Sequence, residues 1–217
     1  MLVDYKIIRR ETDVPLQIFE RKPESSHLYE YLLAANGVFL RAERENLHVC
    51  FPVAHASIRG LQPLDPYVET LLPRVPSRIV KEILDQSVQA CVAAGTSVEA
   101  LFHLFPEHGD WQSVSPRQEA NHIAVKPTET GEGSSYERAL IELHSHHSMK
   151  AFFSGQDNRD EQGFRIYAVL GEIFSRPTLR VRVGCFGYFY EIPARSIFEL
   201  PGGVRCHFDG RVGSDGK

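Results

Sequence analysis

The chain has 217 residues, of which 42% are hydrophobic, enough for a packed core in one large domain or in a small domain beside a medium one. A formal net charge of -4 and a sequence pI near 6.2 give no general attraction to phosphate backbones, so nucleic acid is not an expected partner. The N-terminus lacks an apolar core of signal-peptide length and no stretch approaches the roughly 18 apolar residues that span a bilayer, so we expect a cytoplasmic protein without a membrane partner.

Residues 1–60 are expected to form a small α+β domain. The run HLYEYLLAANG carries apolar residues at helical spacing and ends at Gly37, where a left-handed cap needs no Cβ, which predicts a short helix. The strand-like runs VFLRAE and LHVCFPV lie on either side of the polar residues 44–46 and predict an antiparallel hairpin. Four prolines then follow between Gly60 and Ser77, and each removes a backbone donor. We therefore predict that residues 61–76 form a linker without regular structure.

The second predicted domain covers residues 77–200 and begins with a helix. Ser77 is a suitable N-cap, apolar residues recur at three and four positions from Ile79 to Val92, and Gly95 is a natural stop. The next run, VEALFHLF, is apolar on both faces, as expected of a central strand, and PEHGD supplies a turn into another strand. Glu99 thus stands at the start of a buried strand, where a carboxylate is unfavourable unless it is hydrogen-bonded or functional. His103 has the same strand parity and is interpreted as a core or supporting histidine.

The run HSHHSMKAFFSGQD contains HxH, seven further residues and then SxxD. His144 and His146 lie at i and i+2 in the predicted strand ALIELHSH, so both rings point to one side of a sheet and can bind one ion. Asp157 can return to them as the third ligand, because the eleven residues after His146 leave room for a turn near Gly155. Three protein ligands leave one tetrahedral position open, as in catalytic zinc sites. The sequence therefore predicts one Zn²⁺ per chain, since zinc suits this ligand set better than iron or manganese.

The remaining segments are less informative. The polar, glycine-rich run TETGEGSS is expected to be a mobile loop that could act as a flap. In TLRVRVGCF the apolar residues alternate with Arg180 and Arg182, which predicts a half-exposed strand whose arginines face solvent, and GYFYEIP is another strand. Residues 201–217 contain little apolar periodicity and are predicted to be a flexible tail. The four cysteines are widely separated without a CxxC pair, which indicates reduced, mostly buried thiols.

The run from His144 to Asp157 resembles the JAMM motif of the JAB/MPN family of metallopeptidases, which cleave ubiquitin or ubiquitin-like proteins from lysine amines or from C-terminal extensions. The resemblance covers about residues 77–200, and the whole chain is similar to proteins of the bacterial ParB-related, ThiF-related cassette (PRTRC system). It implies a mixed β-sheet flanked by helices, an α-β-α layering like that of cytidine deaminases. It also implies a ubiquitin-like substrate, with ubiquitin-activating (ThiF-like, E1-like) and ubiquitin-conjugating (E2-like) proteins of the cassette as partners.

The family motif also requires an upstream glutamate as general base and a serine that stabilises the oxyanion. Glu99, 45 residues before His144, fits the first role, and Ser154 resembles the family serine. The chain departs from the family where His147 replaces a proline and Phe102 replaces a glycine. Glu142 is the alternative base, because it shares the parity of the two histidines, although a residue so close to a ligand on one strand approaches the attacking water awkwardly.

Three functions are compatible with these residues. The intact ligand set, serine and base favour a zinc isopeptidase that removes or matures a ubiquitin-like modifier. The alternatives are a non-catalytic scaffold that binds the modifier and a peptidase that releases a sulfur-carrier protein. The sequence alone does not separate the isopeptidase from the sulfur-carrier peptidase.

Overall fold

The protein is described here from a computed structural model, which describes residues 5–7, 28–120, 125–128, 131 and 133–208. It is an α+β protein that divides into two compact units, one ending at Leu71 and the other beginning at Leu72. Within these described segments, no helix is both long and apolar enough to cross a membrane.

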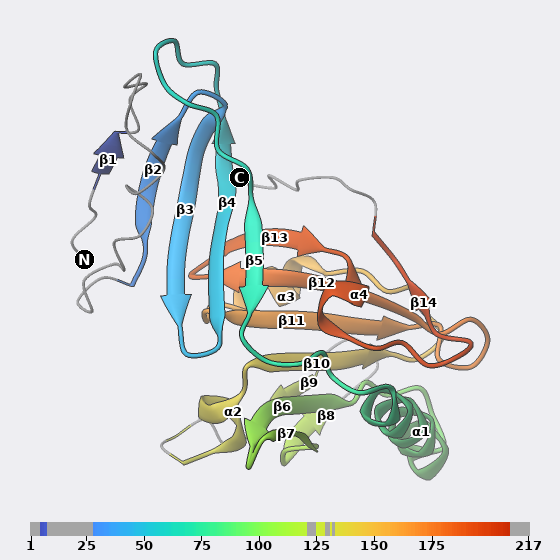
Figure 1. Ribbon diagram of the computed structural model, residues 1–217. Coiled ribbons are helices and arrows are strands. Elements are labelled where there is room, and N and C mark those ends of the chain that lie inside the picture. The colour runs from blue at the N-terminus through green and yellow to red at the C-terminus, as the bar shows by residue number, and fades with distance from the viewer. Residues whose placement is uncertain (1–4, 8–27, 121–124, 129–130, 132, 209–217) are drawn as a thin grey trace. The chain divides into compact units, whose positions relative to one another are not determined.

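The first unit is a five-stranded sheet in which the strands follow one another in chain order (Figure 1). Neighbouring strands are antiparallel, except that β1 runs parallel to β2. The strands are β1 (Tyr5–Ile7), β2 (Glu30–Ala34), β3 (Gly37–Arg44), β4 (Leu47–His55) and β5 (Tyr67–Thr70). The predicted hairpin is confirmed as β3 and β4, which turn through Glu45 and Asn46, and Asn46 has φ 64°. Asparagine tolerates this left-handed conformation better than most residues.

The helix predicted to end at Gly37 is not formed, because residues 30–34 belong to β2. Among its described residues the first unit contains strands and no helix, where an α+β arrangement was expected. In β2, buried and half-buried residues alternate from Glu30 to Ala34, which is the period of a strand. Pairing with β3 and burial on that sheet outweigh the helical spacing of a short apolar run. Gly37 is no helix cap: it begins β3 with φ 148°, and a Cβ there would lie 2.2 Å from the Ala54 carbonyl oxygen.

The proline-rich segment also contains regular structure, contrary to the prediction for residues 61–76. Strand β5 lies between Pro66 and Pro73 and pairs with β4 at the edge of the sheet. The prolines stand outside the strand, so none of them removes a donor from the ladder.

The second unit contains a mixed seven-stranded sheet with the order β13-β12-β11-β10-β6-β7, and β14 pairs with β12 beside this path. The strands are β6 (Leu101–Glu107), β7 (Asp110–Val114), β10 (Ile141–His146), β11 (Arg165–Gly171), β12 (Thr178–Cys185), β13 (Tyr188–Ile192) and β14 (Arg205–Cys206). The central strands β10 and β11 are parallel. The strands predicted from VEALFHLF, ALIELHSH, TLRVRVGCF and GYFYEIP are confirmed, whereas β11 was not predicted. Strands β8 (Gln118–Ala120) and β9 (Val125–Pro127) form a separate pair.

The described residues of this unit form one long helix and three short ones: α1 (Ser77–Ala94), α2 (Ser135–Arg138), α3 (Gly155–Asp160) and α4 (Ala194–Ile197). Helix α1 ends at Gly95 in the left-handed conformation, as predicted. Ser77 is not its N-cap, however, because Pro76 takes that position without a side-chain hydrogen bond. Val92 is 74% exposed and lies outside the buried stripe.

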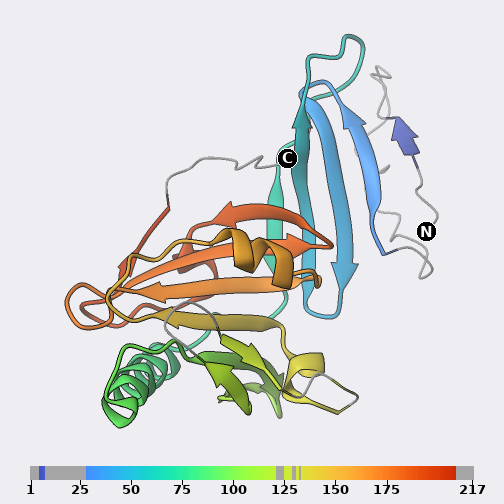
Figure 2. The same cartoon turned by 180° about the vertical axis from the view of Figure 1, so that it is seen from behind.

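The two faces of the seven-stranded sheet are covered differently. Ala100 and Phe102 line a groove of about 310 Å³ together with α1 residues, so α1 covers the face to which the even-numbered residues of β6 point. The opposite face carries His144 and Arg182, and α3 lies against it, as Figure 2 shows. The candidate site lies on this second face.

Two further expectations need correction. Arg182 does not face solvent: it is 5% exposed and pairs with Glu161. Part of the predicted flexible tail is ordered, since β14 pairs with the start of β12, while residues 209–217 lie outside those described. The expected flap in TETGEGSS falls partly on residues 129, 130 and 132, also outside the described segments, and the end of that run begins α2.

Candidate metal centre

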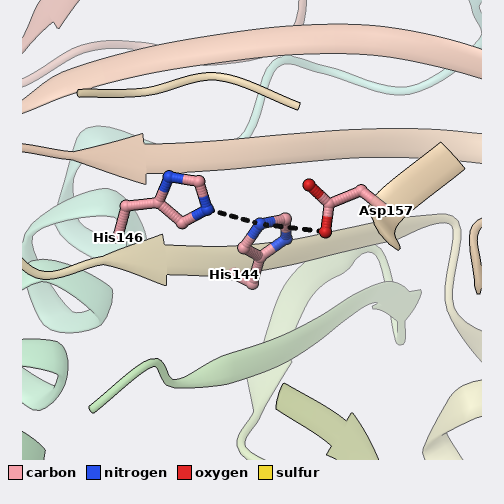
Figure 3. A group of neighbouring side chains, drawn as sticks. All are labelled: His144, His146 and Asp157. Carbon is pink, nitrogen blue, oxygen red and sulfur yellow. Dashed lines mark hydrogen bonds and ion pairs between the residues drawn. The ribbon is translucent and has the colours of Figure 1, made fainter. Parts of the chain in front are cut away.

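His144, His146 and Asp157 form a compact group whose possible ligand atoms all lie within 4.8 Å of one another. The histidines are two residues apart on β10, so both rings leave the same face of the sheet. Asp157 belongs to the first turn of α3. Figure 3 shows the carboxylate reaching from the helix towards the two rings. The sequence-predicted ligands are thus brought together.

The geometry of the two rings suits a shared cation. The Nε2 atoms of His144 and His146 are 3.2 Å apart, and His144 Nε2 is 3.8 Å from Asp157 Oδ1. Both rings are buried, and burial lowers the pKa of each imidazole below its usual value. Two neutral rings that face each other through Nε2, with a carboxylate oxygen beside them, offer the form of imidazole that binds metal ions.

The orientation of His146 is fixed by backbone. Its Nδ1 lies 3.0 Å from the carbonyl oxygen of Lys150, which can only accept, so Nδ1 donates and Nε2 keeps its lone pair. Gly171 allows this contact, because a Cβ there would lie 2.2 Å from the backbone nitrogen of Ala151. The ring of Phe152 packs edge-on against His146, with the ring centres 4.8 Å apart, and is itself 39% exposed, so it lies between His146 and the surface.

Asp157 is fixed by a capping box at the start of α3. Its Oδ2 accepts from the Ser154 backbone nitrogen at 2.5 Å, and Ser154 Oγ accepts from the backbone nitrogens of Asp157 and Gln156 at 3.1 and 3.2 Å. One carboxylate oxygen therefore holds the helix terminus while Oδ1 remains on the side of His144. The hydroxyl of Ser154 uses its lone pairs in these bonds and still has its proton to donate.

Glu99 lies beside the histidines, two residues before β6 begins. Its Oε1 is 3.6 Å from His146 Nε2, and its side chain is almost completely buried. The adjoining backbone is held against β10, because Ala100 N donates to Ser145 Oγ at 3.0 Å and Ser145 N donates to Ala100 O at 2.9 Å. Burial, followed by the Asp157 charge, raises the pKa of Glu99 to about 7. A carboxyl group with such a pKa can accept and release a proton near neutral pH.

Glu142 and His103 belong to a neighbouring cluster on the same face. Glu142 Oε2 lies 3.5 Å from Arg165 Nη1 and 3.9 Å from His103 Nε2. Glu142 is largely buried, since its side chain is only 15% exposed. His103 is a fully buried core histidine, as predicted, and burial followed by Arg165 lowers its pKa to about 4. Glu142 is therefore held by contacts with Arg165 and His103. Glu99 is the carboxylate that lies beside His146.

The sequence analysis missed three groups that contact the ligands or the segment that carries them: the Lys150 carbonyl, Gly171 and Arg182. A backbone carbonyl leaves no signal in sequence. Gly171, at the end of the unpredicted strand β11, could have been noticed as a glycine ending an apolar run. Arg182 shares its sequence signal, alternation with apolar residues, with Arg180, and its buried partners could not be inferred.

The donor set fits one divalent metal ion, with two imidazoles and one carboxylate as ligands. Comparisons with known protein families and with curated proteins found no match for this chain. The residues themselves carry the functional argument: a buried His-His-Asp group that could hold a metal ion and is compatible with a metal-dependent hydrolase.

Proposed function

We propose that the protein is a zinc-dependent peptidase or isopeptidase that hydrolyses the C-terminal linkage or extension of a ubiquitin-like protein. The observation that carries this proposal is the convergence of His144, His146 and Asp157 with a buried glutamate 3.6 Å from His146. The resemblance of the same run to the JAMM motif supports the substrate class, and it also supports zinc as the ion. The mixed sheet with helices on both faces is compatible with the layering that this resemblance implies.

Each residue has a distinct role in the proposed reaction. His144, His146 and Asp157 hold the ion, which when bound would polarise the scissile carbonyl and lower the pKa of water. Glu99 accepts a proton from the attacking water at a carboxylate oxygen and returns it to the leaving amine. Ser154 donates its hydroxyl proton to the oxyanion that develops at the substrate carbonyl, a contact whose loss typically costs about 3 kcal/mol of transition-state stabilisation.

The proposal is tested by measuring the metal content of the purified protein and its cleavage of a C-terminally extended ubiquitin-like protein from the same cassette. About one zinc per chain is expected, with cleavage that a chelator abolishes. The Asp157→Ala variant should lose metal and cleavage together, because one of three ligands is gone.

The matched variant Glu99→Gln separates the ligand role from the base role. It preserves the shape of the side chain and should keep the metal while losing turnover. A wild-type protein that binds zinc without cleaving would favour a binding scaffold or another carrier protein as substrate. A Glu99→Gln protein without metal would contradict the assignment of Glu99 as base.

A further inference from the structure

Helix α3, which carries Asp157, has little to hold it in place by itself. It is six residues long, and none of these residues is buried. Helices this short are unstable in isolation, and most helical stability in proteins comes from an apolar face that packs on the core. The capping box fixes the Asp157 carboxylate within the first turn, so the place of that turn against the sheet must be set by contacts from outside the helix.

These contacts come from β12, through a group we call the Arg182 cluster: Arg182, Asn158, Glu161, Phe153 and Phe189. Arg182 Nη1 donates to Asn158 Oδ1 at 2.6 Å, directly after the ligand in sequence. Its Nε and Nη2 donate to Glu161 Oε2, at the end of α3, at 2.9 and 2.5 Å. The guanidinium thus bonds the helix at two places.

The guanidinium is itself immobilised between aromatic rings. Its carbon lies 3.9 Å from the ring centre of Phe153 and 3.7 Å from that of Phe189. A planar group held at its faces presents its donors in fixed directions, which a flexible ammonium group would not do. Tyr167 of β11 fixes the end of the same segment, since its hydroxyl oxygen accepts from Gly163 N at 3.0 Å.

The energetics argue that this cluster serves geometry rather than stability. Arg182 and Glu161 are each 5% exposed, and the desolvation of such a buried pair usually offsets its attraction, so an apolar pair would serve stability as well. What a buried ion pair adds is a defined arrangement. Here the arrangement is that of the segment which delivers the third ligand.

We propose that Arg182 is the positioning residue of the metal centre, which acts through Asn158 and Glu161 to place the Asp157 carboxylate beside His144. This inference rests on the proposed metal site. Arg182 touches no ligand in the contacts described here, and its own positive charge disfavours a cation nearby. If Arg182 acted only through its charge, its removal would strengthen zinc binding. If it positions Asp157, its removal weakens zinc binding.

The test measures zinc affinity of the full-length protein by competition with a chromophoric chelator. The Arg182→Met variant is expected to bind zinc roughly 10- to 100-fold more weakly, the range typical of groups that orient ligands. Arg180→Met is the matched control. Arg180 lies on the same strand and forms a two-point ion pair with Glu191 of β13 at 2.8 and 2.7 Å, and its loss should change zinc affinity by less than about twofold.

Two more variants test whether a change in zinc affinity comes from the loss of charge or from a loss of folding. Asn158→Ala removes the 2.6 Å contact without changing any charge and should weaken zinc binding in the same direction by a smaller factor. Arg182→Lys keeps the positive charge but lacks the planar guanidinium with its several donors, so it should not bind zinc with wild-type affinity. Cobalt(II) spectra of each variant report whether the carboxylate still binds the ion, a signal that a loss of stability alone would not move.

Unchanged or tighter zinc binding by a folded Arg182→Met protein would overturn the inference, as would full restoration by lysine. If Arg182→Met does not fold, Asn158→Ala decides, and wild-type affinity in that variant would count against positioning. A wild-type protein that binds neither zinc nor cobalt would instead overturn the proposed metal site itself.

Discussion

The three candidate metal ligands come from two regions that are held in opposite ways. His144 and His146 stand on β10, a buried strand between β6 and β11 whose backbone is paired on both sides. Asp157 stands on α3, which has no buried residue and depends on capping and on the Arg182 cluster. The strand would keep its place without a metal because the sheet forms the core of the unit. The contacts that the described residues of the helix make with β12 are polar, and the ion would add to them when present.

This difference indicates how the site would assemble. A sheet supplies two preformed ligands at a fixed spacing, and a short helix supplies the third as a closing element. Elements with few buried apolar contacts open most easily, whereas central strands open only with the whole fold. Metal binding should therefore order the helix side and leave the strand side nearly unchanged.

The largest expected effect is the difference in amide hydrogen exchange rate between α3 and β10. In the metal-free protein the amides of α3 should exchange through local opening, on the order of 100-fold or more faster than those of β10 after correction for intrinsic rates. Zinc should slow exchange in α3 and alter β10 little. The measurement is amide exchange by mass spectrometry with and without zinc.

The Asp157→Ala variant is the control for that experiment, because zinc should no longer protect α3 when the ligand on the helix is missing. Equal protection of α3 and β10 in the metal-free wild type would contradict the proposed difference between the two sides.

The same division explains what the sequence could predict. The ligands were predictable because HxH on a strand places both rings on one face by period alone, and SxxD is a local capping pattern. The central strands were predictable from continuous apolar runs. These are short-range features, which the chain carries within a few residues.

What the sequence could not predict depends on distant partners. The run that precedes Gly37 has helical spacing, and only its pairing with β3 makes it a strand. Arg182 resembles a solvent-facing residue until α3 and the rings of Phe153 and Phe189 enclose it. Proline density suggested a linker, yet β5 fits between the prolines because β4 offers a free edge.

On the strand side, Glu99 makes the stability of the metal-free protein depend on pH. Burial raises its pKa from 4.5 to about 7, so the folded state holds the proton more tightly than the unfolded state. The stabilisation is complete below pH 4.5 and is lost as the pH rises through about 7. The wild type should lose roughly 3 kcal/mol from this group between these limits, and Glu99→Gln should not.

The measurement is chemical denaturation of metal-free wild type and Glu99→Gln between pH 5 and pH 8. The lowered pKa values of His144 and His146 act in the opposite direction, but they act in both proteins, so the difference between the two curves isolates Glu99. Glu107→Gln, an exposed carboxylate on β6, is the matched control. Parallel curves for wild type and Glu99→Gln would contradict a buried, proton-holding Glu99.

The smallest expected effect concerns the close contact between Gly171 and the segment that follows β10. A methyl group at Gly171 would meet the backbone of Lys150 and Ala151 at 2.5 and 2.2 Å, so Gly171→Ala must push this segment away from β11. The Lys150 carbonyl would then leave His146 Nδ1, and the ring would lose the hydrogen bond that fixes its tautomer. Zinc affinity should fall by roughly 10-fold, towards the lower end of the range for such supporting groups, because β10 itself stays paired. Titration with zinc measures the affinity, and the NMR signal of the His146 Nδ1 proton reports whether the hydrogen bond to Lys150 is lost. A variant that loses stability yet binds zinc as tightly as the wild type would show that the histidines do not need this hydrogen bond.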